Sequence, residues 1–76
     1  MSGDSNQLVV RTDHDGLAVL TLNRPDRLNA LNVAMFRELD NQIAALEQAT
    51  ESVGCVVLRG AGRCFSAGHD LDDIAV

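Results

Sequence analysis

The stretch LAVLTLNRPDRLNALN, residues 17–32, sets the order of the predicted elements. Its first six residues predict a strand whose two faces are both largely apolar, and such a strand is expected to be covered on two sides. Pro25 then removes a backbone donor and moves Arg24 away from helical angles, so the strand gives way to a loop. The stretch ends at Asn32, a favourable N-cap residue, and therefore predicts a helix that begins at residue 33.

The helix is expected over residues 33–50, where apolar side chains recur every three or four positions. The apolar stripe consists of Phe36, Leu39, Ile43 and Leu46, with Met35 at its edge. One apolar stripe indicates a helix that packs through a single face. The acidic residues Glu38, Asp40 and Glu47 are then expected on its solvated face, where none of them is a poised catalytic carboxylate.

Shorter apolar runs before and after these elements predict two further strands. Residues 8–12 form one strand, and a hairpin turn at residues 13–16, with Asp-Gly at its end, leads to the returning strand at 17–22. Residues 55–58, CVVL, form a buried strand after the helix. Because a helix that joins two strands favours a parallel, right-handed arrangement, the predicted class is α/β.

The composition restricts the classes of function. The chain has 76 residues and a formal net charge of −5, which limits it to one small domain that repels phosphate backbones. With two Phe and no Tyr or Trp, it offers few rings for base stacking, so we expect no nucleic-acid partner. Residues 1–7 are expected to be a mobile polar tail, and no apolar run approaches the ~20 residues of a membrane span. Cys55 and Cys64 are expected to be free thiols in a reducing, cytoplasmic compartment, with Cys55 buried among apolar neighbours.

Two loops of unusual sequence, residues 23–31 and 60–70, follow the two parallel strands. Ligands bind at the carboxyl ends of such strands, so we expect a functional site where these loops meet.

Several kinds of chemistry are poorly matched by GRCFSAGHDL, residues 62–71. The adjacent pair His69-Asp70 lacks the spacing of metal ligands, so no metal is expected. The glycines that follow the last strand lack both nucleotide-binding fingerprints. Cys64 or Ser66 could act as a nucleophile with a histidine base, but no signature of a catalytic triad surrounds them.

The turn Ser66-Ala67-Gly68 is compatible with one further role. Residues 71–76 predict the first turn of a helix, and the N–H groups before a helix are unpaired at the positive end of its dipole. Small residues let a ligand approach this backbone closely. The turn is therefore either a holder for a carbonyl oxygen that becomes negative or an ordinary loop before a helix.

Two blocks of the sequence resemble the N-terminal portion of the crotonase superfamily, the enoyl-CoA hydratase/isomerase proteins. They are LAVLTLNRPDRLNALN, residues 17–32, and CVVLRGAGRCFSAGHDL, residues 55–71. The resemblance covers nearly all of residues 8–76 and keeps the order and spacing of the blocks. It implies a ββαβ spiral unit of the ClpP/crotonase type and identifies residues 8–76 as the N-terminal, incomplete part of an acyl-CoA-binding domain.

The resemblance also implies roles for individual residues. The backbone N–H of Ala67 is expected to be one of two oxyanion-hole donors for the thioester carbonyl of an acyl-CoA. The residues implied to bind this substrate are Arg24, Asn29, Ala30, Leu31, Ala67, Gly68, His69 and Asp70. Coenzyme A enters as part of the substrate, with no separate cofactor and no metal. His69 stands where the family often has a small residue, so its ring either reshapes the cleft or points to solvent.

For the full-length parent, the resemblance implies an enoyl-CoA hydratase (a lyase) or isomerase of fatty acid metabolism, assembled as a homotrimer or hexamer. The second oxyanion donor and the catalytic glutamates of the family have no counterpart in these 76 residues. The chain is therefore expected to be a truncated piece that is inactive alone. The alternative is a non-catalytic CoA-binding or assembly module of the same fold.

Overall fold

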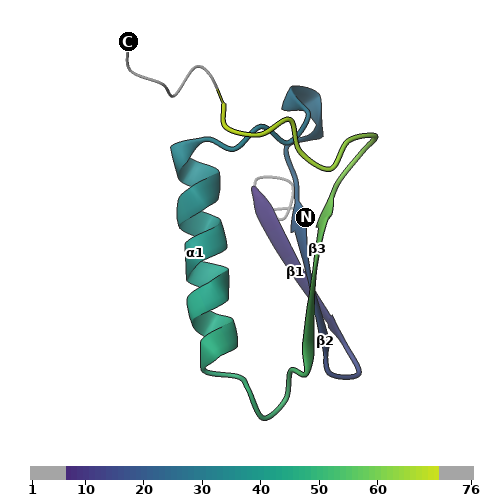
Figure 1. The fold of residues 1–76 in the computed structure, drawn as a ribbon, viewed down its shortest axis with the longest axis vertical. Coiled ribbons are helices and arrows are strands. Elements are labelled where there is room, and N and C mark those ends of the chain that lie inside the picture. The colour runs from purple at the N-terminus through teal and green to yellow at the C-terminus, as the bar shows by residue number, and fades with distance from the viewer. Residues whose placement is uncertain (1–6, 71–76) are drawn as a thin grey trace.

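The computed structural model describes residues 7–70, which form a three-stranded sheet with one long helix beside it (Figure 1). The elements are β1 (Val9–His14), β2 (Leu17–Leu22), the 3-10 helix η2 (Pro25–Arg27), α1 (Val33–Glu47) and β3 (Cys55–Gly60). The predicted order of strand, strand, helix and strand is confirmed. Most of the expected tail, residues 1–6, and the expected helix start at residues 71–76 lie outside the described residues.

The first two strands form a hairpin with a two-residue turn. β1 and β2 pair antiparallel up to His14 opposite Leu17, which leaves only Asp15 and Gly16 to connect them. Both turn residues have positive φ, 47° and 82°, the conformation that type I′ turns require and that the sequence Asp-Gly favours. β1 therefore runs two residues further than predicted, because the turn needs no more than this pair.

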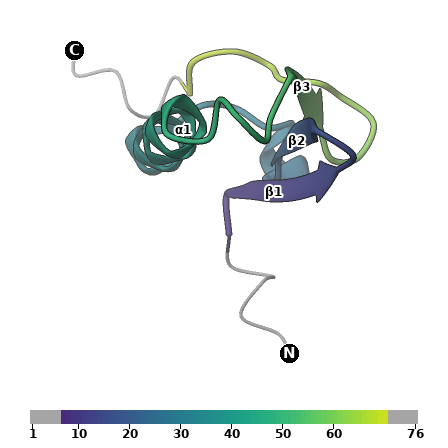
Figure 2. The same cartoon turned by 90° about the horizontal axis from the view of Figure 1, so that it is seen from below.

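The last strand lies parallel to β2. Leu17 pairs with Cys55 and Leu22 with Gly60, in the strand order β1-β2-β3. Helix α1 makes the crossover between β2 and β3, and Figure 2 shows it along one side of the sheet. The predicted α/β arrangement with a parallel pair is confirmed, and the carboxyl ends of β2 and β3 lie at the same end of the sheet.

The core lies between α1 and the sheet. Val9, Leu20 and Leu22 from the strands enclose Met35, which is fully buried, and Leu39 and Leu46 pack against them.

The predicted contact stripe of the helix is partly wrong. Phe36 is 43% exposed and Ile43 is 46% exposed. The helix meets the sheet through the line of Met35, Leu39 and Leu46, and Phe36 lies ~100° around the axis from Met35. Apolar residues on both sides of the contact line left its centre undefined in the sequence.

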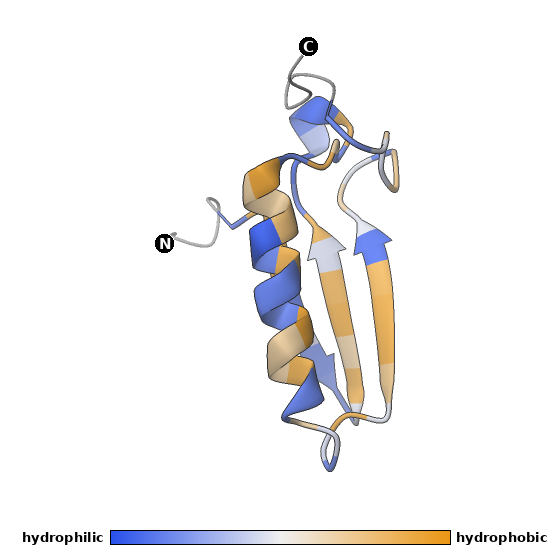
Figure 3. Cartoon of the chain, turned by 60° about the vertical axis from the view of Figure 1, so that its left-hand side comes forward, coloured by the Kyte–Doolittle hydropathy of each residue, from blue (hydrophilic) through white to orange (hydrophobic). Residues whose placement is uncertain are grey.

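The prediction that β3 is buried is also wrong for the described residues. Val56, Val57 and Leu58 are 48%, 39% and 43% exposed, and Cys55 is exposed rather than enclosed. The physical reason is that β3 is an edge strand with no residue in the core cluster of residues 7–70, although its first four residues, CVVL, are as apolar as those of β2 (Figure 3).

β2 is covered on one face rather than two within residues 7–70. Its buried residues, Ala18, Leu20 and Leu22, alternate with residues that are half-buried. Burial of alternate residues is the pattern of a sheet with a helix on one side only.

The opposite edge of the sheet, β1, carries charged side chains. The Arg11 Nε donates to Asp13 Oδ1 at 2.7 Å, and this hydrogen bond holds the pKa of the Asp13 carboxyl below its ordinary value. Charges of this kind discourage another chain from pairing with an edge strand. No helix within residues 7–70 is long and apolar enough to span a membrane.

One acidic side chain of α1 ties the helix to the sheet. The Glu38 Oε1 accepts from the backbone N–H of Leu8 and of Val9, both at 3.0 Å. Glu38 was expected on a solvated face, but it is half-buried and satisfies two donors at the start of β1. It therefore fixes the position at which the first strand enters the sheet.

We expect Glu38→Ala to lower the free energy of unfolding by about 1–3 kcal/mol, because two partly buried N–H groups lose their acceptor. Glu38→Gln keeps an acceptor oxygen and should lose less. Glu47→Ala, at an exposed position of the same helix, is the control and should change stability by less than about 0.5 kcal/mol. Urea unfolding measures all three, and equal effects of the two alanine variants would contradict the role given to Glu38.

Candidate functional site

The loops that follow β2 and β3 lie against each other at the carboxyl ends of these strands, beside the N-terminal end of α1 (Figure 1). Leu31 and His69 form a parallel β-bridge. In this bridge the Leu31 N–H donates to the Gly68 carbonyl at 2.7 Å, and the Asp70 N–H donates to the Leu31 carbonyl at 2.9 Å. The expectation that the two loops meet at the carboxyl ends of β2 and β3 is confirmed.

The side chain of Asn29 joins the loops and is completely buried. Its Oδ1 accepts from the Arg24 N–H at 2.7 Å. Its Nδ2 donates to the carbonyls of Ala61 and Cys64 at 2.9 and 2.8 Å. The backbone of Asn29 has φ of 54°, a left-handed conformation that asparagine adopts more readily than most residues. The amide is thus fully used inside the chain.

Arg24 and Asp70 form a second link between the loops. The Arg24 Nη1 lies 2.6 Å from Asp70 Oδ2, and their side chains are 15% and 6% exposed. The same nitrogen donates to the Ala30 carbonyl at 2.8 Å. A partly buried pair with an additional hydrogen bond fixes geometry, because separating its members would leave a buried charge unpaired.

Three amides of the turn before residue 71 are already engaged. The Ala67 N–H donates to the Leu28 carbonyl at 2.9 Å, and the Gly68 N–H donates to Ser66 Oγ at 3.0 Å. The Asp70 N–H is used in the bridge to Leu31. The prediction that the Ala67 N–H is an available donor is therefore wrong in this structure, because the loop containing Leu28 folds back to accept it.

His69 has the remaining amide of this turn. Leu31 bonds to the two residues on either side of His69, so the N–H and carbonyl of His69 itself point away from Leu31. None of residues 7–70 accepts a hydrogen bond from that N–H. The His69 ring makes an edge contact with Phe36 on α1, with centroids 5.7 Å apart. An unpaired amide in a turn between two fixed neighbours is a possible donor to a ligand.

A hollow of about 290 Å³ adjoins this turn. It is lined by Leu22, Leu31, Leu39, Leu58, Phe65, Ser66 and Gly68. Its wall is apolar apart from the Ser66 hydroxyl and the backbone of the turn. Such a hollow accommodates an uncharged group, because a charged group would lose its hydration without gaining a partner.

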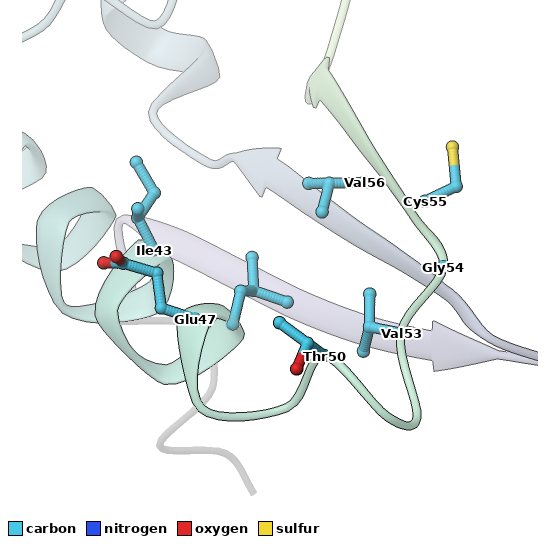
Figure 4. Close-up of a pocket in the computed structure, with 8 residues that line it drawn as sticks. Ile43, Glu47, Thr50, Val53, Gly54, Cys55 and Val56 are labelled. Carbon is cyan, nitrogen blue, oxygen red and sulfur yellow. The ribbon is translucent and has the colours of Figure 1, made fainter.

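A second hollow, of about 490 Å³, lies between the end of α1 and the start of β3 (Figure 4). Ile43 and Val56 face it from the two elements, and Glu47 is its one charged lining residue. It lacks a set of converging polar groups. No group of three His, Cys, Asp or Glu side chains within residues 7–70 is placed to hold a metal ion.

All eight residues predicted for substrate binding lie in this one region, but three of them have polar side chains bonded within the chain. These are Arg24, Asn29 and Asp70. Ser66 was expected in the turn of the site, but the bond of its hydroxyl to the Gly68 N–H and the contact of Phe36 with His69 were not predicted. Serine side chains often bond to the backbone two residues further on, so the bond between Ser66 and Gly68 could have been predicted from the sequence. The contact of Phe36 depends on the orientation of α1 and had no local signal.

Comparison with known proteins places this geometry in a family. A family model described as enoyl-CoA hydratase/isomerase matches residues 17–76, so the chain belongs to that family. A protein of Rhodobacter capsulatus named "Probable enoyl-CoA hydratase" is 51% identical over 59 residues, which cover 78% of this chain and 22% of that protein. The 1,2-epoxyphenylacetyl-CoA isomerase of Escherichia coli is 45% identical over 58 residues, 76% of this chain and 22% of its own length.

A solved structure of an enoyl-CoA hydratase from Mycobacterium smegmatis has a TM-score of 0.84 and 40% identity, covering 93% of this chain and 28% of that one. The crotonase-like fold expected from the sequence is thereby confirmed. The chain spans about a fifth of the length of the two relatives that it matches.

We expect Asn29→Asp to destabilise the protein by about 3 kcal/mol or more, because a carboxylate oxygen would then face the carbonyls of Ala61 and Cys64. Asn32→Asp is the matched control. Asn32 caps α1 only through its Oδ1, which accepts from the Met35 N–H at 2.9 Å, and aspartate caps equally well. Thermal unfolding at neutral pH should separate the two variants clearly. If Asn29→Asp left the stability of the protein unchanged, the role of the buried amide would be refuted.

Proposed function

We propose that this chain forms one wall of an acyl-CoA site and donates the His69 N–H to the thioester carbonyl oxygen. The proposal rests on one observation: among the amides of residues 67–70, that of His69 has no acceptor within the described part of the chain. Family membership supports the substrate class, because the family model is described as enoyl-CoA hydratase/isomerase. Coenzyme A is then the carrier part of the substrate, and no separate cofactor is proposed.

The chemistry follows from where negative charge develops. When a thioester loses an α-proton, or when an α,β-unsaturated thioester gains a nucleophile at its β-carbon, electrons accumulate on the carbonyl oxygen as an enolate. A fixed N–H at 2.7–3.1 Å from that oxygen stabilises the charge without further reorganisation, and one such donor contributes ~3–4 kcal/mol to catalysis. The fixed neighbours of His69 give its N–H the rigidity that this role requires.

The residues of the two loops divide into two roles under this proposal. Arg24, Asn29 and Asp70 hold the loops together, since their polar atoms bond to the chain itself. The backbone near Leu31 and Gly68, which borders the apolar hollow, is left to contact the substrate. The apolar lining favours an uncharged acyl group at this point.

The test is to remove the amide hydrogen of residue 69 while keeping its neighbours. His69→Pro lacks the N–H, and His69→Ala keeps it but lacks the ring. In the protein that carries this chain, turnover of crotonyl-CoA should fall by about 10²–10³-fold in kcat for the proline variant and by less than about tenfold for the alanine variant. Circular dichroism checks that both variants fold.

A binding measurement accompanies the kinetics. Acetoacetyl-CoA forms an enolate that absorbs in the near ultraviolet, and the wild-type protein and His69→Ala should stabilise that absorbance. A folded His69→Pro variant that turns over crotonyl-CoA and binds the enolate like His69→Ala would refute the assignment of this N–H.

A further inference from the structure

We propose that Ser66 is a positioning residue of this site, whose hydroxyl holds the Gly68 N–H so that the next amide, that of His69, is the one presented to the thioester. The inference rests on the proposed function and adds to it the group that determines which amide faces the substrate.

The Ser66 hydroxyl has a defined direction. It donates to the Asn29 carbonyl at 2.8 Å and accepts from the Gly68 N–H at 3.0 Å. Because its only proton points to Asn29, the lone pairs of the oxygen are left for Gly68. The hydroxyl thus connects the loop after β2 to one chosen amide of the turn.

Gly68 is the residue of the turn that most needs such a restraint. Its φ is 99°, and a Cβ built on it would meet no atom within 4 Å. Glycine is therefore required by the backbone conformation rather than by lack of space. A glycine with open space around it has wide conformational freedom, so the Ser66 bond limits rotation of the peptide between residues 67 and 68.

The other hydrogen bonds of the turn come from the backbone. The Ala67 N–H is held by Leu28, and both the Gly68 carbonyl and the Asp70 N–H are held by Leu31. The Gly68 N–H is the one amide here that depends on a side chain. Loss of the hydroxyl would free it to compete with the His69 N–H for a substrate oxygen and would loosen the direction of both.

The same contacts argue against Ser66 as a nucleophile. Its proton is directed to a carbonyl, whereas a nucleophilic serine donates to a base. The His69 ring, three residues away, contacts Phe36. Ser66 therefore acts through the amides of its neighbours.

The test compares Ser66→Ala with Ser66→Thr, which keeps a hydroxyl, and with Ser52→Ala as the matched control. Ser52 is exposed, and its hydroxyl also donates to a backbone carbonyl, that of Ala49 at 3.2 Å. In the protein that carries this chain, Ser66→Ala should lower kcat for crotonyl-CoA by about 10- to 100-fold, with KM changed by less than about threefold. Ser66→Thr should retain kcat within about threefold, and Ser52→Ala should match the wild type.

Amide NMR supplies a readout that a general loss of stability would not move selectively. Hydrogen exchange at Gly68 should be faster in Ser66→Ala than in wild type, while exchange in β2 is unchanged. Acetoacetyl-CoA should shift the His69 amide resonance in the wild type and in Ser66→Thr, and should shift it less in Ser66→Ala.

The outcomes separate the two proposals. If the His69 amide of the wild type does not respond to the thioester, the proposed function is refuted. If it responds in the wild type and equally in Ser66→Ala, with kcat retained, the function stands and the role of Ser66 is refuted. If Ser66→Ala fails to fold, Ser66→Thr decides. A folded Ser66→Thr whose Gly68 amide is not protected from hydrogen exchange, but whose kcat equals that of the wild type, would also overturn that role.

Discussion

The buried amide of Asn29 is the interaction on which the rest of this end of the molecule depends. An asparagine side chain is both donor and acceptor, and here one amide meets the Arg24 N–H and two carbonyls of the other loop at 2.7–2.9 Å. Aspartate would offer no donor and leucine no polar atom at all. One uncharged group therefore makes two hydrogen bonds from the first loop to the second, and no disulfide joins the loops because both cysteines are free.

With the loops held in this way, the smaller contacts have a fixed frame. The Arg24–Asp70 pair and the bridge of Leu31 to His69 both span the same two loops. Each of them saturates polar groups that would otherwise be available to a ligand. Among the amides of residues 67–70, these bonds leave only that of His69 without an acceptor in the described part of the chain, and the hollow beside the turn has an apolar wall. In the site that we propose, the backbone, more than reactive side chains, provides the chemistry.

The features that could be predicted from the sequence are those with local causes. The Asp15-Gly16 turn, the Asn32 cap and the meeting of the two loops follow from residue types within a few positions, together with the rule for helix crossovers. The face of α1, the exposure of β3 and the engagement of the Ala67 N–H were not predicted correctly. Each of these depends on which distant segment lies opposite, and a single sequence carries no local signal for that.

The two edges of the sheet differ in a way that matters before the protein is ever active. β1 ends in ionic side chains, whereas β3, at the other edge of the sheet formed by residues 7–70, exposes Val56, Val57 and Leu58. During synthesis, such a strand is a template for ladders between nascent chains until something covers it. The yield of soluble material should then depend on how long this edge stays open, and therefore on expression rate, temperature and chaperone supply, more than on the equilibrium stability of the finished fold.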